Sequence, residues 1–110
     1  MHRRGIYHCD IKLDNVLVMN DTFLVKLCDF GLASHISDSL KSRQTRRGTP
    51  GYLGPELFTN NGSIMGEKSD NFSLGALFYN LLSGGKLSLV IGSRHKEIMH
   101  NNINGNFNSL

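Results

Sequence analysis

The sequence predicts an α+β fold that is mainly helical and carries one short β-hairpin. Two apolar or β-branched runs, VLVM at 16–19 and FLVKLC at 23–28, flank the polar residues NDT, which is the pattern of a hairpin. Residues 69–85 form a long apolar stretch with capping residues at its start and a pair of glycines at its end, which indicates a substantial helix. With 110 residues, the chain is long enough for one domain but not for two.

The elements before and after the hairpin are less regular. MHRR followed by Gly5 is typical of the last turn of a helix with a glycine stop, and such a helix would begin before Met1. Beyond the hairpin, residues 32–51 are rich in Ser, Thr, Arg and Gly and predict a loop of about 20 residues.

The long helix is expected over about residues 70–82. Ser69 or Asp70 can cap its start, and Gly84 with Gly85 ends it. Its large apolar side chains point to several sides, so we expect it to be buried nearly all round.

The last part of the chain predicts less structure. SRHKEIMH, residues 93–100, indicates a second and weaker helix. The tail NNINGNFNSL, residues 101–110, is half asparagine and has little reason to be ordered by itself.

Composition excludes several classes of protein. Hydrophobic residues make up 39%, and no apolar run approaches the roughly 20 residues of a membrane helix, so no membrane partner is expected. Cys9 and Cys28 are too few for a disulfide framework and no export signal opens the chain, which favours a cytoplasmic protein, with the nucleus as the alternative. The net charge of +3 is mild, and the basic stretch at 41–47 is short, so no nucleic-acid partner is expected.

Four polar side chains flank the hairpin. Asp10, Lys12 and Asn15 precede it, and Asp29 begins the turn that follows it. Because a hairpin returns the chain, Asn15 and Asp29 can meet as the oxygen ligands that Mg²⁺ prefers. Lys12 would then neutralise a phosphoryl group, and Asp10 would accept a hydrogen bond from an attacking hydroxyl.

Two alternatives stand beside this interpretation. Each aspartate alone could be a turn or cap residue, whereas the spacing of all four side chains favours function. His8, next to Cys9 and Asp10, raises the alternative of zinc, but no paired C-x-x-C or H-x₃-H spacing supports it.

Four motifs in order resemble the protein kinase family: H-x-D-x-K-x-x-N at 8–15, DFG at 29–31, GTPGYLGPE at 48–56 and DNFSLG at 70–75. Lys12 two residues after Asp10, together with the GTPGY run, resembles serine/threonine rather than tyrosine kinases. The segments GTPGYLGPE and VKLCDFGLA are most similar to calmodulin-dependent-kinase-like sequences.

This resemblance implies a partial protein kinase catalytic domain over residues 1–110. It would be the helical C-terminal lobe, with the hairpin at the catalytic cleft, a catalytic loop at 8–15 and an activation segment at 29–56. The smaller N-terminal lobe, with its glycine-rich loop, strand lysine and helix glutamate, would precede Met1.

The resemblance also implies the role of each site residue, carried over position by position. Asp10 would be the catalytic aspartate, Lys12 would face the phosphate, and Asn15 and Asp29 would bind Mg²⁺. Leu17 would form the floor of the adenine pocket of ATP. Thr49 would connect the peptide-binding loop to Asp10 and Lys12, and Asp70 would anchor the catalytic loop. His8 and Phe30 would be packing residues, and Cys28 a small buried side chain beside the nucleotide.

Several positions depart from the family pattern. Gly54 stands where alanine is usual, Phe72 replaces a tryptophan, and the arginine partner of Glu56 would lie beyond Leu110. Cys9 stands where many kinases have an arginine that binds a phosphorylated activation loop.

Two functions of different classes follow from these observations. The first is a serine/threonine protein kinase that uses ATP and Mg²⁺ to phosphorylate a protein hydroxyl, with this chain working only within a longer polypeptide. The alternative is a truncated kinase-like fragment without turnover, which serves as a binding surface or has no function. The intact set Asp10, Lys12, Asn15 and Asp29 favours the first, and the missing lobe favours the second.

Overall fold

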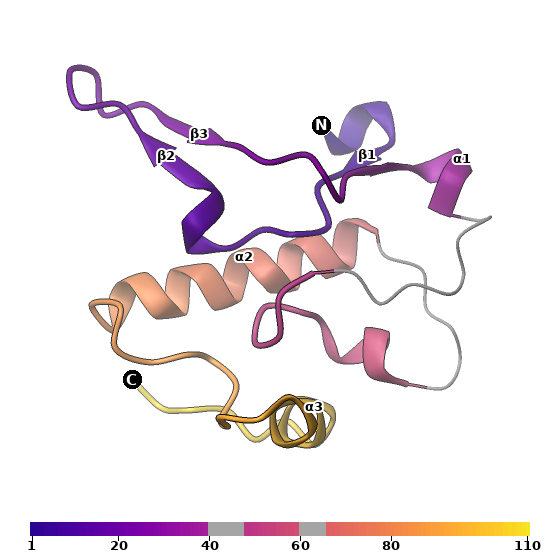
Figure 1. Ribbon diagram of the computed structural model, residues 1–110, viewed down its shortest axis with the longest axis vertical. Coiled ribbons are helices and arrows are strands. Elements are labelled where there is room, and N and C mark those ends of the chain that lie inside the picture. The colour runs from indigo at the N-terminus through magenta and orange to yellow at the C-terminus, as the bar shows by residue number, and fades with distance from the viewer. Residues whose placement is uncertain (40–47, 60–65) are drawn as a thin grey trace.

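The computed structural model describes residues 1–39, 48–59 and 66–110. Figure 1 shows helix α2 crossing the middle of the molecule, with a β-hairpin on one side and helix α3 on the other. In chain order the elements are η1 His2–Arg4, β1 Ile6–Tyr7, η2 Leu13–Asn15, β2 Val16–Val18, β3 Val25–Leu27, β4 Ser34–His35, α1 Ile36–Ser39, η3 Pro55–Phe58, α2 Glu67–Leu82 and α3 His95–Ile103.

The predicted hairpin is confirmed. Strands β2 and β3 are antiparallel, with Val16 opposite Leu27 and Val18 opposite Val25. These β-branched and apolar side chains suit a pleated strand, and the polar NDT residues make the turn. The glycine stop after MHRR is also confirmed, since Gly5 has a φ of 68°, although the turn that it ends is a single 3₁₀ turn.

The loop predicted over residues 32–51 is wrong at its beginning. Strand β4 pairs with β1, so that Ile6 lies opposite His35 and Tyr7 lies opposite Ser34, and the short helix α1 follows directly. The partner of β4 lies almost 30 residues earlier in the chain, and a local composition rich in Ser and Gly does not report such a distant pairing.

Helix α2 begins earlier than predicted. Its first residue is Glu67 and its N-cap is Gly66, so Ser69 and Asp70 lie inside the helix and the predicted caps are wrong. Both side chains are buried and bind other segments instead. The predicted glycine pair does end the helix, with φ values of 67° and 76°.

The expectation that α2 is buried nearly all round is also wrong. Ala76 and Leu77 are buried, but Leu74, Phe78 and Leu82 are 41%, 55% and 74% exposed. In the described parts of the chain, none of the helices combines the length and the apolar character needed to cross a membrane.

Helix α3 confirms the second predicted helix, with later bounds. The tail is better anchored than its composition predicts, because the backbone of Asn108 donates to the Leu89 carbonyl at 2.9 Å and Val90 forms a β-bridge with Phe107. The main apolar cluster lies between η3 and α3 and consists of Leu53, Leu57 and Phe58, with Met99 packed against it.

Candidate active site

One buried carboxylate fixes the loop that joins β1 to η2. Asp70 of α2 is 1% exposed and accepts hydrogen bonds from the backbone N–H groups of His8 and Cys9, both at 2.9 Å. The Nε2 atom of His2 lies 2.8 Å from the same carboxylate. The anchoring contact implied for Asp70 is therefore present, and its three polar partners offset the cost of burying it.

His8 links this loop to the end of the hairpin. Its ring is fully buried, and Nε2–H donates to the Cys28 carbonyl at 2.9 Å while Nδ1 accepts from the backbone N–H of Asp10 at 3.3 Å. Phe30 packs edge-on against the ring, with centroids 5.0 Å apart. His8 is the packing residue that we predicted, and it also carries two hydrogen bonds that the sequence did not reveal.

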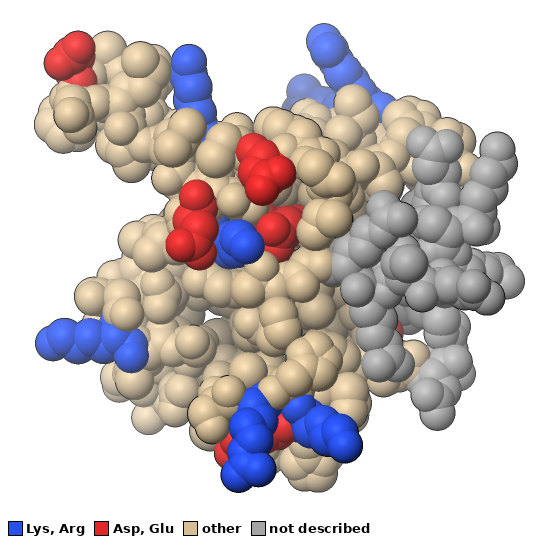
Figure 2. All heavy atoms as spheres, in the orientation of Figure 1, with Lys and Arg blue, Asp and Glu red and all other residues tan. Residues whose placement is uncertain are grey.

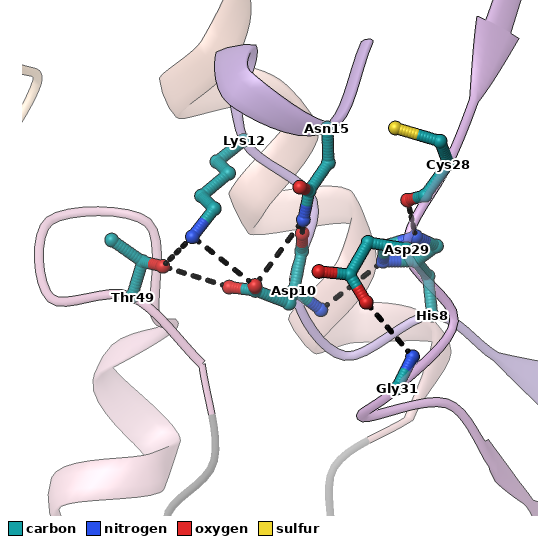
Figure 3. A network of polar contacts seen from close by, with 8 residues as sticks. All are labelled: His8, Asp10, Lys12, Asn15, Cys28, Asp29, Gly31 and Thr49. Atoms are coloured by element: carbon teal, nitrogen blue, oxygen red, sulfur yellow. Dashed lines mark hydrogen bonds and ion pairs between the residues drawn. The ribbon is translucent and has the colours of Figure 1, made fainter.

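The centre of the site is a network around Asp10 (Figure 3). The Thr49 hydroxyl donates to Asp10 Oδ1 at 2.8 Å and accepts from Lys12 Nζ at 3.0 Å, and Lys12 lies 3.3 Å from Asp10 Oδ2. The Asn15 amide donates to the Asp10 carbonyl at 2.8 Å and to its carboxylate at 3.2 Å. Thr49 thus joins two segments that are 39 residues apart.

These contacts determine the ionisation of Asp10. Burial alone raises the pKa of its carboxyl, but the Thr49 hydrogen bond, the hydrogen bond and charge of Lys12, and the Asn15 hydrogen bond together outweigh burial. The net result is a pKa below the ordinary value, so Asp10 is a carboxylate at neutral pH.

The hairpin brings Asn15 and Asp29 to one end. The Cys28 N–H donates to the Asn15 carbonyl at 2.9 Å, which extends the β2–β3 ladder by one step. Asp29 has a φ of 59°, and its Oδ1 accepts from the Gly31 N–H at 3.1 Å. Leu17, which we expect to contact adenine, is 54% exposed on β2.

The donor set at this end fits Mg²⁺. The Asn15 amide nitrogen donates to Asp10, so the Asn15 amide oxygen is the atom that can bind a metal ion. One Asp29 carboxylate oxygen accepts from Gly31, and the other points toward the Asp10 side of the network (Figure 3). Amide and carboxylate oxygens suit a hard cation that also keeps waters. Within the three described ranges, no three His, Cys, Asp or Glu side chains are grouped so as to hold a metal ion.

Several acidic side chains gather around one basic side chain near the site (Figure 2). Figure 2 shows acidic side chains around a single basic one, over the loop before β2 and the adjoining end of the hairpin. An excess of carboxylates there favours the binding of cations.

Comparison with known proteins shows the family of the chain. Residues 1–109 match the protein kinase domain family. The chain belongs to the protein kinase family. It is 39% identical over 108 residues to myosin light chain kinase 2, skeletal/cardiac muscle, of Oryctolagus cuniculus, which is 97% of this chain and 17% of that kinase.

Two plant relatives are of the serine/threonine type. The chain is 41% identical over 85 residues to the serine/threonine-protein kinase RUNKEL of Arabidopsis thaliana, which covers 76% of this chain and 6% of the relative. It is 45% identical over 86 residues to CBL-interacting serine/threonine-protein kinase 13 of the same plant, covering 76% of this chain and 16% of the relative. The resemblance to serine/threonine kinases is confirmed, and this kinase chain spans about a sixth or less of the length of these relatives.

The structure brings most of the predicted site residues of this kinase chain together. Asp10, Lys12, Asn15 and Thr49 share one network. Leu17 lies on β2 and Asp29 lies just after β3, and neither takes part in that network's hydrogen bonds. The catalytic, nucleotide and metal roles of these residues remain predictions. Thr45, the position that matches an activation-loop phosphosite, lies outside the described residues.

The departures from the family pattern have structural consequences. Cys9 is buried with a φ of 66°, and its Sγ lies 3.6 Å from the Ser34 hydroxyl. Glu56, whose arginine partner we expected beyond Leu110, accepts a hydrogen bond from the Ser69 hydroxyl at 2.8 Å. Cys28 is partly exposed rather than buried.

Sequence reasoning missed two side chains that hold the Thr49 loop. The Ser73 hydroxyl of α2 donates to the Tyr52 carbonyl at 2.6 Å, and the Asn102 amide of α3 donates to the Leu53 carbonyl at 2.6 Å. Ser73 could have been noticed as a polar residue within an apolar helix pattern, whereas Asn102 is hidden in an asparagine-rich stretch.

Proposed function

We propose that the chain forms the catalytic face of a serine/threonine protein kinase, which transfers the γ-phosphoryl group of ATP to a hydroxyl of a protein substrate. The observation that carries this proposal is the Thr49 hydroxyl, which bridges Asp10 at 2.8 Å and Lys12 at 3.0 Å. A carboxylate acceptor held beside a fixed cation suits a reaction that depends on positioning and charge stabilisation.

In the proposed mechanism, Asp10 acts on the attacking hydroxyl. Its lowered pKa keeps it ionised, so it accepts a hydrogen bond from the substrate hydroxyl and takes the proton as the new bond to the γ-phosphorus forms. The bond from that phosphorus to the bridging oxygen breaks, and ADP leaves. Lys12, held beside Asp10, offsets the negative charge of the phosphoryl group in transfer.

Asn15 and Asp29 are the proposed ligands of Mg²⁺, which would neutralise phosphate oxygens of ATP. Leu17 would contact the adenine from one side. We assign the chain to the helical C-terminal lobe, and because Leu17 is 54% exposed we propose that the opposite wall comes from a smaller N-terminal lobe.

The test is phosphoryl transfer to serine- and threonine-containing peptides by the full chain, meaning the longer polypeptide that includes the proposed N-terminal lobe, and by its Asp10→Asn variant. Removal of the proton acceptor is expected to lower kcat by about 10²–10⁴-fold. Asp21→Asn is the matched control, since Asp21 is an exposed residue in the hairpin turn. Equal activity of D10N and D21N would exclude the proposed role of Asp10.

The alternative, a kinase-like chain without turnover, has its own expected result. The half-exposed Leu17 favours it, because adenine would gain little burial on one wall. If the full chain transfers no phosphoryl group with Mg²⁺ and ATP, this alternative replaces the first function.

A further inference from the structure

We propose that Asn102 is a positioning residue of the phosphoryl-transfer site, acting through Leu53 to hold Thr49 beside Asp10 and Lys12. The expected effect on kcat rests on the proposed function, whereas the contacts from Asn102 through Leu53 to the Thr49 segment follow from the geometry alone.

Asn102 is a polar side chain at the edge of an apolar cluster. It is 1% exposed, and Met99, one turn earlier on α3, packs against Leu53, Leu57 and Phe58. The Asn102 amide nitrogen donates to the Leu53 carbonyl at 2.6 Å, while its Oδ1 is buried and has no hydrogen-bond partner among the described residues. Burying an unpaired amide oxygen costs free energy, so packing alone does not explain an asparagine at this position.

Leu53 transmits the position of Asn102 to the Thr49 loop. A Cβ on Gly48 would lie 2.6 Å from a Leu53 methyl and 2.9 Å from the Cys9 carbonyl, so the Leu53 side chain lies directly on Gly48. Gly48 precedes Thr49, and the Tyr52 N–H closes a turn on the Thr49 carbonyl at 3.1 Å. A shift of Leu53 therefore displaces the segment that carries Thr49.

The network at the other end of this path is sensitive to displacement. Thr49 lies 2.8 Å from Asp10 and 3.0 Å from Lys12, and hydrogen bonds weaken steeply as distance and angle depart from their optimum. Misplacement of a catalytic group by about 1 Å can cost about 100-fold in rate. The path Asn102–Leu53–Gly48–Thr49 thus couples α3 to Asp10.

Asn102→Leu in the full chain tests the proposal, since leucine keeps the branching at Cγ but cannot donate. The matched control is Asn101→Leu, because Asn101 makes the same kind of bond from the same helix, to the Ile91 carbonyl at 2.9 Å, and does not bind Leu53. N102L is expected to lower kcat about fivefold to tenfold, the effect of about one lost hydrogen bond, with an unchanged KM for Mg²⁺-ATP. N101L is expected to leave both unchanged.

A second readout does not depend on turnover. With ¹³C-methyl-labelled threonine, the Thr49 methyl resonance should shift in N102L and stay in place in N101L, while the thermal unfolding midpoint of N102L stays within about 3 °C of the original protein. If N102L does not fold, Asn102→Ala replaces it, with the same expectations for kcat and the Thr49 resonance.

The outcomes separate this proposal from the proposed function. An unchanged Thr49 resonance in the folded variant would overturn the role of Asn102, because the Ser73 bond to Tyr52 would then hold the loop by itself. Equal losses in N102L and N101L would overturn it as well. If the original protein transfers no phosphoryl group, the proposed function fails, and the Thr49 resonance still decides whether Asn102 positions the loop.

Discussion

At Asp10, hydrogen bonds outweigh the cost of burial. Burial raises the pKa of the carboxyl, but the contacts with Thr49, Lys12 and Asn15 bring it below the ordinary value of 3.8. A carboxyl whose pKa is lowered in the folded state stabilises the fold fully above the unfolded-state pKa. That stabilisation is lost as the pH falls through the folded-state pKa.

Thr49→Val should therefore destabilise the protein in a pH-dependent way. Without the hydroxyl, the pKa of Asp10 rises toward its ordinary value, and the free energy of unfolding should fall by about 1 kcal/mol near neutral pH. The difference from the original protein should shrink below about pH 4, measured by urea unfolding at a series of pH values. Thr59→Val is the control, since within the described residues the Thr59 hydroxyl donates to the Glu56 carbonyl and not to Asp10, and its effect should not vary with the ionisation of Asp10. A constant difference for T49V would contradict the assigned cause.

Cys9 bears on how the proposed kinase activity would be regulated. Its buried side chain lies 3.6 Å from the Ser34 hydroxyl, and a cysteine carries no positive charge, so it cannot make the charge-assisted bond that an arginine makes to a phosphate. A charge-assisted bond of this kind is worth about 1.5–3 kcal/mol, and Cys9 cannot form one with a phosphate on Thr45. We therefore expect Thr45→Ala to retain at least about half of the kcat of the full chain. Thr59→Ala serves as the control in the same peptide assay. A collapse of activity in T45A alone would show that other basic groups bind the phosphate.

Among the elements, those with local signals were predictable from sequence. The hairpin follows from its β-branched runs, and the end of α2 follows from two glycines. The start of α2 was not predictable, because Ser69 and Asp70 are good capping residues that here bind Glu56 and the loop before Asp10 instead. The same residue types serve caps and long-range hydrogen bonds, so the sequence alone does not separate the two.

The contact between η3 and α2 also explains a departure from the family pattern. A Cβ on Gly54 would clash with the Glu56 carboxylate, which accepts a hydrogen bond from the Ser69 hydroxyl at 2.8 Å. Glycine at this position thus leaves room for Glu56 to fold back toward α2. Because Gly54 has a φ of −66°, alanine would not strain the backbone there.

A double-mutant cycle tests this arrangement. Gly54→Ala alone should change the free energy of unfolding by less than about 0.5 kcal/mol, because two effects oppose each other. Alanine lowers the conformational entropy of the unfolded chain, which stabilises the fold, but its Cβ displaces Glu56 and weakens the hydrogen bond from Ser69. In a Ser69→Ala background that bond is already lost, so the same change should stabilise by about 0.4–1 kcal/mol. Chemical denaturation of the four proteins measures the coupling, and additive effects would contradict it.

At the scale of the whole molecule, sequence predicts which faces are apolar but not what covers them. The apolar residues of α2 are distributed around the helix, yet Phe78 and Leu82 remain 55% and 74% exposed. The molecule is only 19 Å thick along its shortest axis, so α2 has structure packed on some sides and solvent on others. Burial depends on the other segments present, and hydrophobic periodicity carries no information about them.

The same openness predicts weak nucleotide binding by residues 1–110 taken alone. Leu17 is 54% exposed and the Asp29 side chain is also open to solvent, so ATP would contact one wall and bury little of its surface. We expect a Kd in the millimolar range or weaker, about −4 kcal/mol, and no thermal shift with about 1 mM Mg²⁺-ATP. Differential scanning fluorimetry of these residues measures the shift, and Asp29→Asn is the matched variant. A clear shift that D29N abolishes would show that the hairpin side binds nucleotide without a second wall, and the proposed need for an N-terminal lobe would then fall.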